Sequence, residues 1–186
     1  MRGLVDRARL DEFMTRLGGR AQVDAECLLI GGATAVALGW RDATIDIDLE
    51  LVPQNDDLLR AVAELKHALG INVELVSTAD FIPPLPGADE RSLFETKRGH
   101  LTFRHVDPYA QALAKLERGH ARDVADVKEM ARRGLIESTR LRELFAAIEP
   151  ELFRYPAIDP PSFASAVAAA ADALAGLRSW SAEADR

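Results

Sequence analysis

Residues 44–52, with the sequence TIDIDLELV, alternate strictly between polar and apolar side chains. Successive side chains of a strand point to opposite faces, so this alternation predicts a β-strand with one buried and one wet face. The buried face would carry Ile45, Ile47, Leu49 and Leu51, and the wet face would carry Thr44, Asp46, Asp48 and Glu50. The segment therefore places three carboxylates on one exposed face of a strand.

Helix and strand patterns alternate around this strand as far as residue 107. Residues 26–30, ECLLI, predict a short buried strand that runs directly into Gly31-Gly32, and ATAVAL predicts a short helix ended by Gly39. The remaining patterns predict helices over residues 3–17 and 56–69, and strands over residues 71–77, 91–96 and 100–106. We expect an α/β fold of the α+β kind over residues 1–107, with an N-terminal helix.

The character of the chain changes after Asp107-Pro108. Helical patterns then follow one another over residues 108–118, 121–133, 138–148 and 162–178, with prolines before the last of them. We therefore expect a C-terminal helical region over residues 108–186. The sequence after residue 150 predicts no catalytic or binding residue.

Charge and cysteine content limit the class of protein. The chain has 23 Lys and Arg against 30 Asp and Glu, a net charge of −7, which argues against general coating of duplex nucleic acid. Cys27 is the single cysteine, so no intramolecular disulfide is possible and a reducing compartment is expected. No apolar run approaches the roughly 20 residues of a membrane span, and the start shows no signal core. We expect a cytoplasmic protein that does not enter a membrane.

The carboxylates of Asp46 and Asp48 are candidates for a metal site. Residues two apart on a strand point the same way and lie about 7 Å apart, so the pair could hold a hard divalent cation such as Mg²⁺ between them. The alternative is an ordinary solvated strand face. Aspartate is depleted in strands, and Glu50 adds a further like charge, so this face favours a cation.

Thirteen residues separate the step Gly31-Gly32 from Asp46. A strand that runs through two glycines into a helix offers backbone N–H groups to an anion, and glycine lets a phosphate approach the backbone closely. A metal site beside a phosphate cradle is typical of phosphoryl or nucleotidyl transfer.

The segment IGGATAVALGWRDATIDIDLEL resembles the signature of the nucleotidyltransferase superfamily with the DNA-polymerase-β-type palm. Within it, the pattern R-x-x-T-x-D-I-D resembles AbiEii-type and related bacterial nucleotidyltransferase-like proteins, and KLERGHARDVADV resembles their second motif. The resemblance covers roughly residues 25–135. It implies a small mixed-sheet palm with flanking helices, a nucleoside triphosphate (NTP) as substrate, and Mg²⁺, with two ions possible.

The resemblance also implies roles for residues of the first motif. Asp46 and Asp48 would be metal ligands and catalytic, and Gly31 and Gly32 would approach the triphosphate. The superfamily often has Ser where this chain has Gly32, so Thr34 is a candidate for the missing hydroxyl. Arg41 and Thr44 are further nucleotide-binding candidates.

Active members usually have a third carboxylate that binds metal and takes the proton of the attacking hydroxyl. Glu74, in INVELVS, is our candidate for this catalytic and metal-binding position, because its neighbours Val73 and Leu75 would point the other way. Glu50 competes with it. An ordinary exposed strand glutamate is the alternative for Glu74.

Lys115 and Arg118 belong to the second motif and share one helix face. The resemblance implies that Lys115 reaches the triphosphate. Residues 97–133 carry nine Lys and Arg against five Asp and Glu, which suits an anionic ligand. For Arg122 and Asp126 an ordinary helix pair is the simpler interpretation.

Two functions remain open at the level of sequence. The first is a Mg²⁺-dependent nucleotidyltransferase that modifies a protein or RNA hydroxyl, with a cognate toxin or antitoxin as partner. The second is a nucleotidyltransferase-like binding module that has lost turnover, which Gly32 and the uncertain third carboxylate favour.

Overall fold

The computed structural model describes residues 3–184, with side chains as far as residue 176. The chain forms two compact units. The first, here called the sheet unit, runs to Ser77 and resumes over Ser92–Val106. The second, the helical unit, combines Thr78–Arg91 with the chain from Asp107 onward. The two units therefore interleave along the sequence, whereas we expected one boundary near residue 107.

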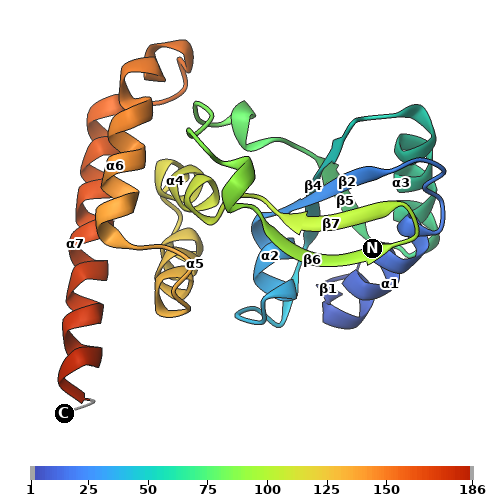
Figure 1. The fold of residues 1–186 in the computed structure, drawn as a ribbon, viewed down its shortest axis with the longest axis horizontal. Helices are drawn as coiled ribbons and strands as arrows, with labels where there is room; N and C mark the ends of the chain where they lie inside the picture. The colour runs from blue at the N-terminus through green and yellow to red at the C-terminus, as the bar shows by residue number, and fades with distance from the viewer. Residues whose placement is uncertain (1–2, 185–186) are drawn as a thin grey trace. The chain divides into compact units, whose positions relative to one another are not determined.

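The sheet unit contains a five-stranded mixed sheet in the order β5-β4-β2-β7-β6 (Figure 1). Strand β4 is antiparallel to β2 and parallel to β5, and β7 is parallel to β2 and antiparallel to β6. The strands are β2 (Ala25–Ile30), β4 (Asp46–Val52), β5 (Asn72–Leu75), β6 (Leu93–Arg98) and β7 (Leu101–His105).

Helices α1 (Arg7–Gly18), α2 (Gly31–Ala37) and α3 (Asp56–Ala68) supply the other half of the core. Their buried side chains form one hydrophobic cluster with alternate residues of the strands. The fully buried members include Phe13, Leu29, Ile47, Leu49 and Phe103. Because strand side chains alternate, the polar set on β4 faces away from this cluster. This arrangement confirms the predicted α+β class.

Two elements predicted in the sheet unit, the helix over residues 3–17 and the strand over residues 44–52, differ from the structure. The first helix begins at Arg7, because Asp6 caps it by accepting from the Arg9 N–H, and Val5–Asp6 form strand β1 instead. Strand β1 pairs with β3 (Ala43–Thr44) in a separate two-stranded sheet. The predicted strand over residues 44–52 is therefore divided at Ile45, whose side chain is exposed and not in the core.

The helical unit consists of α4 (Pro108–Arg118), α5 (Ala121–Arg132), α6 (Ser138–Ile148) and α7 (Pro160–Ala184), with 3₁₀ turns at Thr78–Asp80, Asp89–Arg91 and Glu149–Arg154. The first three helices match the predicted ranges closely, whereas α7 extends beyond the predicted 162–178 at both ends. Asp107 caps α4 by accepting from the Tyr109 N–H, and it also binds Arg91. Over the described residues, the helices are all too short or too polar to cross a membrane.

Candidate active site

The candidate site lies on the polar face of the sheet, where β4 and β5 run side by side. In their parallel register Asp46 is paired with Asn72, and Asp48 is paired with Glu74. Registered residues on neighbouring strands share a face, so these four side chains form a two-by-two arrangement. The structure thus places Glu74 next to Asp48, on the face predicted for it. Glu50 lies one further step along β4, registered with Leu28 of β2.

Asn72 is the member of this arrangement that sequence reasoning missed. Its amide nitrogen donates to Asp46 Oδ1 at 2.6 Å and to Glu74 Oε1 at 2.9 Å. The two carboxylates therefore converge on one nitrogen, which joins β4 to β5. A paired register cannot be read from one strand alone, so the sequence carried no direct signal for this role.

The Gly31-Gly32 step adjoins the same carboxylates. Strand β2 ends with Ile30 registered against Asp48, and Gly31 follows with a φ of +60° that disfavours any other residue. A β-carbon at position 31 would lie 3.0 Å from Asp48 Oδ2. The backbone of α2 therefore begins against the Asp48 carboxylate.

Gly32 is explained by close packing against Thr44. A β-carbon at position 32 would lie 2.1 Å from Thr44 Oγ1, which is far inside any permitted contact. Glycine is thus required here by the Thr44 side chain, which is itself buried. Gly32 at the start of α2 and Thr44 in β3, both nucleotide-binding candidates, therefore contact each other.

Thr34 and Arg41 occupy other surroundings. Thr34 is 2% exposed, and its hydroxyl lies 3.0 Å from the Leu29 carbonyl and 3.1 Å from His105 Nδ1. The hydroxyl is thus engaged inside the unit, where a phosphate has no access. Arg41 lines a pocket of about 540 Å³ together with the start of α1 and the end of α2.

The oxygen ligands at the site suit a hard divalent cation. Mg²⁺ is commonly held by one or two carboxylates together with substrate phosphates, and Asp46 and Asp48 provide such a pair. Among the described residues, no three His, Cys, Asp or Glu side chains are gathered closely enough to hold a metal by themselves. The residues present therefore fit a cation that binds together with a phosphate.

Lys115 and Arg118 lie in the helical unit and take part in an ion-pair cluster. Lys115 is 3% exposed, and its Nζ lies 2.6 Å from Asp126 Oδ2 and 3.4 Å from Asp123 Oδ1. Arg118 binds both oxygens of Asp123 at 2.8 Å. Burial raises the pKa of Asp123, but hydrogen bonds from Arg118 and the charge of Lys115 outweigh this and hold it below its usual value. The predicted phosphate ligands are thus engaged with carboxylates.

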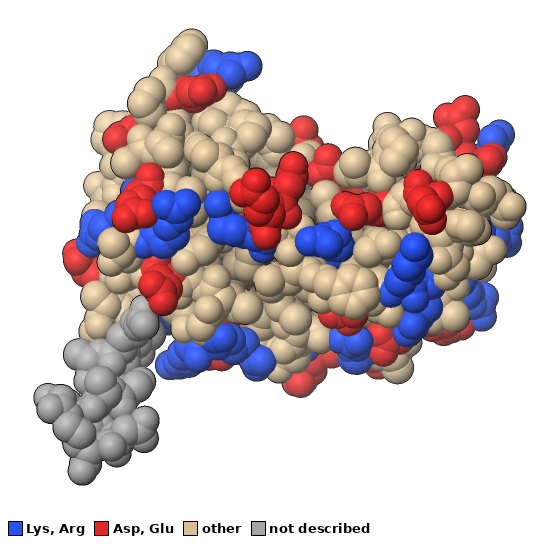
Figure 2. All heavy atoms as spheres, in the orientation of Figure 1, with Lys and Arg blue, Asp and Glu red and all other residues tan. Residues whose placement is uncertain are grey.

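Charges on one face of the molecule are mixed. On the face shown in Figure 2, Lys and Arg side chains are interspersed with Asp and Glu side chains. Such a distribution agrees with the net charge of −7 and differs from the broad basic surface that coats duplex nucleic acid.

The fold is a mixed sheet with helices on one face and an acidic pair on the other, beside the Gly31-Gly32 start of α2, which is an α+β architecture. Residues 7–156 match the family described as "Nucleotidyltransferase of unknown function (DUF6036)", and the chain belongs to this family. The match confirms the predicted relation to the nucleotidyltransferases, whereas the likeness to AbiEii-type proteins stays a prediction. Comparison with curated proteins and with solved structures found no match.

Proposed function

We propose that this protein is a Mg²⁺-dependent nucleotidyltransferase that moves a nucleoside monophosphate from an NTP to a hydroxyl of a protein or an RNA. The observation that supports the proposal best is the pairing of Asp48 with Glu74 beside Asp46, on the polar face of the sheet. Family membership supports the general reaction class.

Asp46 and Asp48 would hold Mg²⁺, which supplies charge neutralisation to the reacting phosphate when bound. Glu74 would accept the proton of the acceptor hydroxyl. The acceptor oxygen then forms a bond to the α-phosphorus, the bond between the α- and β-phosphates breaks, and pyrophosphate leaves. The backbone at Gly31 and Gly32 would approach the triphosphate.

The acceptor and its biological setting follow from the resemblance of the motif alone. We propose a toxin–antitoxin or phage-defence pair, in which the acceptor is a partner protein or an RNA of that pair. The protein would act in the cytoplasm.

A partner-binding module without turnover is the second candidate. The observation in its favour is Asn72, whose amide already satisfies one oxygen each of Asp46 and Glu74. In such a module these residues would join two strands and would not need a cation.

Transfer of a labelled nucleotide separates the two candidates. Wild type is incubated with each of the four labelled NTPs, Mg²⁺, and RNA or protein acceptors, including the chain itself. We expect labelling, and a loss of at least about a hundredfold in Glu74→Gln while NTP binding remains, the range for a lost general base.

Glu50→Gln is the comparison variant for Glu74→Gln, because Glu50 is the competing carboxylate on the same face, one step further along β4. If wild type transfers no label from any of the four NTPs, the proposal that the protein is an enzyme is contradicted. Equal labelling by wild type and Glu74→Gln would remove Glu74 from the mechanism, and loss in Glu50→Gln would transfer its role to Glu50.

A further inference from the structure

Helix α2 is too short to be stable by itself. It has seven residues, and Ile30 at its N-cap provides no side-chain hydrogen bond. Isolated helices shorter than about 12 residues are marginal in water because nucleation is costly. Nevertheless its first two residues lie against Asp48 and Thr44, so a small shift of α2 would change the candidate site. Contacts from elsewhere must hold it in place.

His105 makes the first such contact. It ends β7, its side chain is fully buried, and its Nδ1 lies 3.1 Å from the Thr34 hydroxyl in the middle of α2. Burial lowers the pKa of His105, although Glu95 opposes this shift, so the neutral ring is favoured. The ring therefore binds α2 without requiring a buried charge of its own.

Arg7 makes the second contact, from the first residue of α1. Its guanidinium donates to the carbonyl oxygen of Ala37, the last residue of α2, and also to Asp11 of α1. Carbonyl groups at a helix C-terminus lack partners within the helix, so this donor satisfies one of them. The two contacts hold α2 in its middle and at its end.

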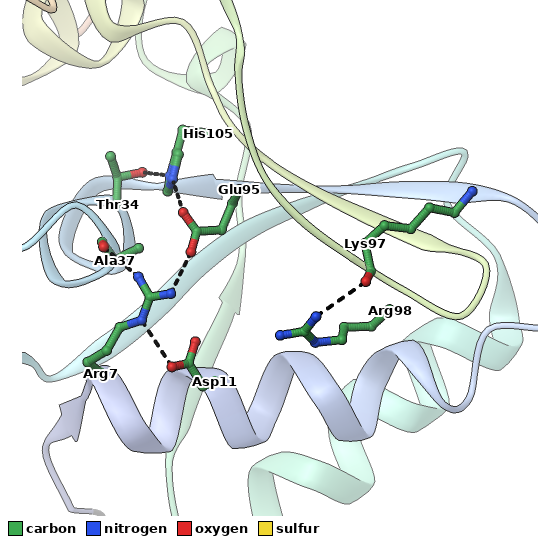
Figure 3. A network of polar contacts seen from close by, with 8 residues as sticks. All are labelled: Arg7, Asp11, Thr34, Ala37, Glu95, Lys97, Arg98 and His105. Atoms are coloured by element: carbon green, nitrogen blue, oxygen red, sulfur yellow. Dashed lines mark hydrogen bonds and ion pairs between the residues drawn. The ribbon is translucent and has the colours of Figure 1, made fainter.

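Glu95 joins the two contacts into one network (Figure 3). Its Oε2 lies 3.0 Å from His105 Nε2, and its Oε1 accepts from Arg7 at 2.7 Å. Strand β6 has an irregular register between Phe94 and Thr96, which leaves Glu95 as an extra residue opposite β7. Such bulges redirect a side chain, and here Glu95 points to the helix-covered side of the sheet.

We infer that Arg7, Glu95 and His105 form a positioning clamp that fixes α2, and with it the Gly31-Gly32 backbone, against Asp48. The three residues come from α1, β6 and β7, and they stabilise a helix that is too short to be stable in isolation. The effect of this clamp on ATP binding rests on the proposed function, whereas its effect on the position of α2 does not. None of the three is a catalytic residue, since they act on the site through α2.

Two substitutions of Glu95 provide a matched test. Glu95→Leu removes both acceptor oxygens and should release the His105 and Arg7 contacts together. Glu95→Gln keeps one oxygen for Arg7, and its amide can donate to His105 Nε2 if the ring proton moves to Nδ1. The glutamine variant should therefore preserve the clamp. Arg7→Met removes the contacts with Ala37 and Glu95 but leaves His105 on Thr34, and Asp11→Asn is the control, because its amide oxygen can still accept from Arg7.

Amide hydrogen exchange measures the hold on α2 directly. We expect exchange of the α2 amides to accelerate at least about tenfold in Glu95→Leu and Arg7→Met, relative to the amides of α3 in the same sample. Glu95→Gln and Asp11→Asn should exchange like wild type. Equal acceleration in α2 and α3 would indicate general destabilisation, and unchanged exchange in α2 would indicate no hold; either result overturns the clamp.

ATP binding measures the effect on the site. In Glu95→Leu we expect the affinity for ATP with Mg²⁺ to fall about tenfold, with recovery in Glu95→Gln, because α2 no longer stays against Asp48. Faster amide exchange in α2 together with unchanged ATP affinity would overturn the positioning role. Wild type that fails to bind any NTP would overturn the proposed function and the positioning role, while α2 exchange would still decide whether the clamp exists.

Discussion

Replacing Lys115 with methionine should markedly lower the midpoint temperature of thermal unfolding. Methionine keeps the apolar stem but removes the ammonium group, and with it the 2.6 Å ion pair of Asp126, which is 3% exposed. Asp123 keeps both hydrogen bonds from Arg118, so most of the cost falls on Asp126. Removing one partner of a buried ion pair costs about 3–5 kcal/mol.

That cost is a large part of the about 5–15 kcal/mol by which proteins of this kind are stable. A chain of 150–250 residues loses about 2–4 °C for each kcal/mol, so the midpoint of thermal unfolding should fall by roughly 10 °C. Lys128→Met is the matched control, because Lys128 is an exposed lysine on α5. A midpoint for Lys115→Met within about 2 °C of this control would refute the reasoning.

Removing both partners separates stability from phosphate binding. Lys115→Met with Asp126→Leu should recover at least half of the lost midpoint, because apolar residues often replace a buried pair without loss. If Lys115 also binds the triphosphate, this folded double variant should lose roughly ten- to hundredfold in ATP affinity and little in adenosine affinity. Equal losses for both ligands would restrict Lys115 to its structural pair.

Three further perturbations test other parts of the structure. Asp46→Ala with Asp48→Ala should abolish the rise in melting temperature that Mg²⁺ and ATP give wild type, and an equal rise in both proteins would contradict the metal assignment. Because burial lowers the pKa of His105, the unfolded chain binds a proton first as the pH falls below about 6.5, so stability to urea should decline there more steeply in wild type than in His105→Gln. Gly32→Ala should cost about 1–3 kcal/mol through its clash with Thr44, and urea unfolding should show partial recovery when Thr44→Ala is added, because the Thr44 β-carbon at 2.9 Å remains; no cost in the single variant would disprove the contact.

Local patterns predicted most of the elements. The alternation around Asp46 and Asp48 located β4 and its two faces, and Asp107-Pro108 marked the start of α4. These features depend on neighbours within a few residues, so sequence periodicity is sufficient to find them. Glu74 also followed from alternation within β5, and the register then placed it beside Asp48.

Contacts between distant segments could not be predicted in the same way. The strand over residues 44–52 is divided because Ala43–Thr44 pair with Val5–Asp6, about 40 residues earlier in the chain. The role of Glu95 depends on an extra residue in β6 that becomes visible only against β7. Lys115 looked like a free cation on a helix, because the partners that bury it lie on the following helix.

We expect Asn72 to oppose the loading of a cation at this site. Its amide makes charge-assisted hydrogen bonds to Asp46 and Glu74, and each such bond contributes about 1.5–3 kcal/mol. A cation held by Asp46 and Asp48 must replace the bond to Asp46 when it takes that oxygen, so we expect the two carboxylates alone to bind it weakly. A triphosphate adds oxygen ligands and negative charge to the same cation, which shifts the balance toward loading. An enzyme built this way therefore loads its metal together with its substrate, whereas a binding module would keep the amide where it is.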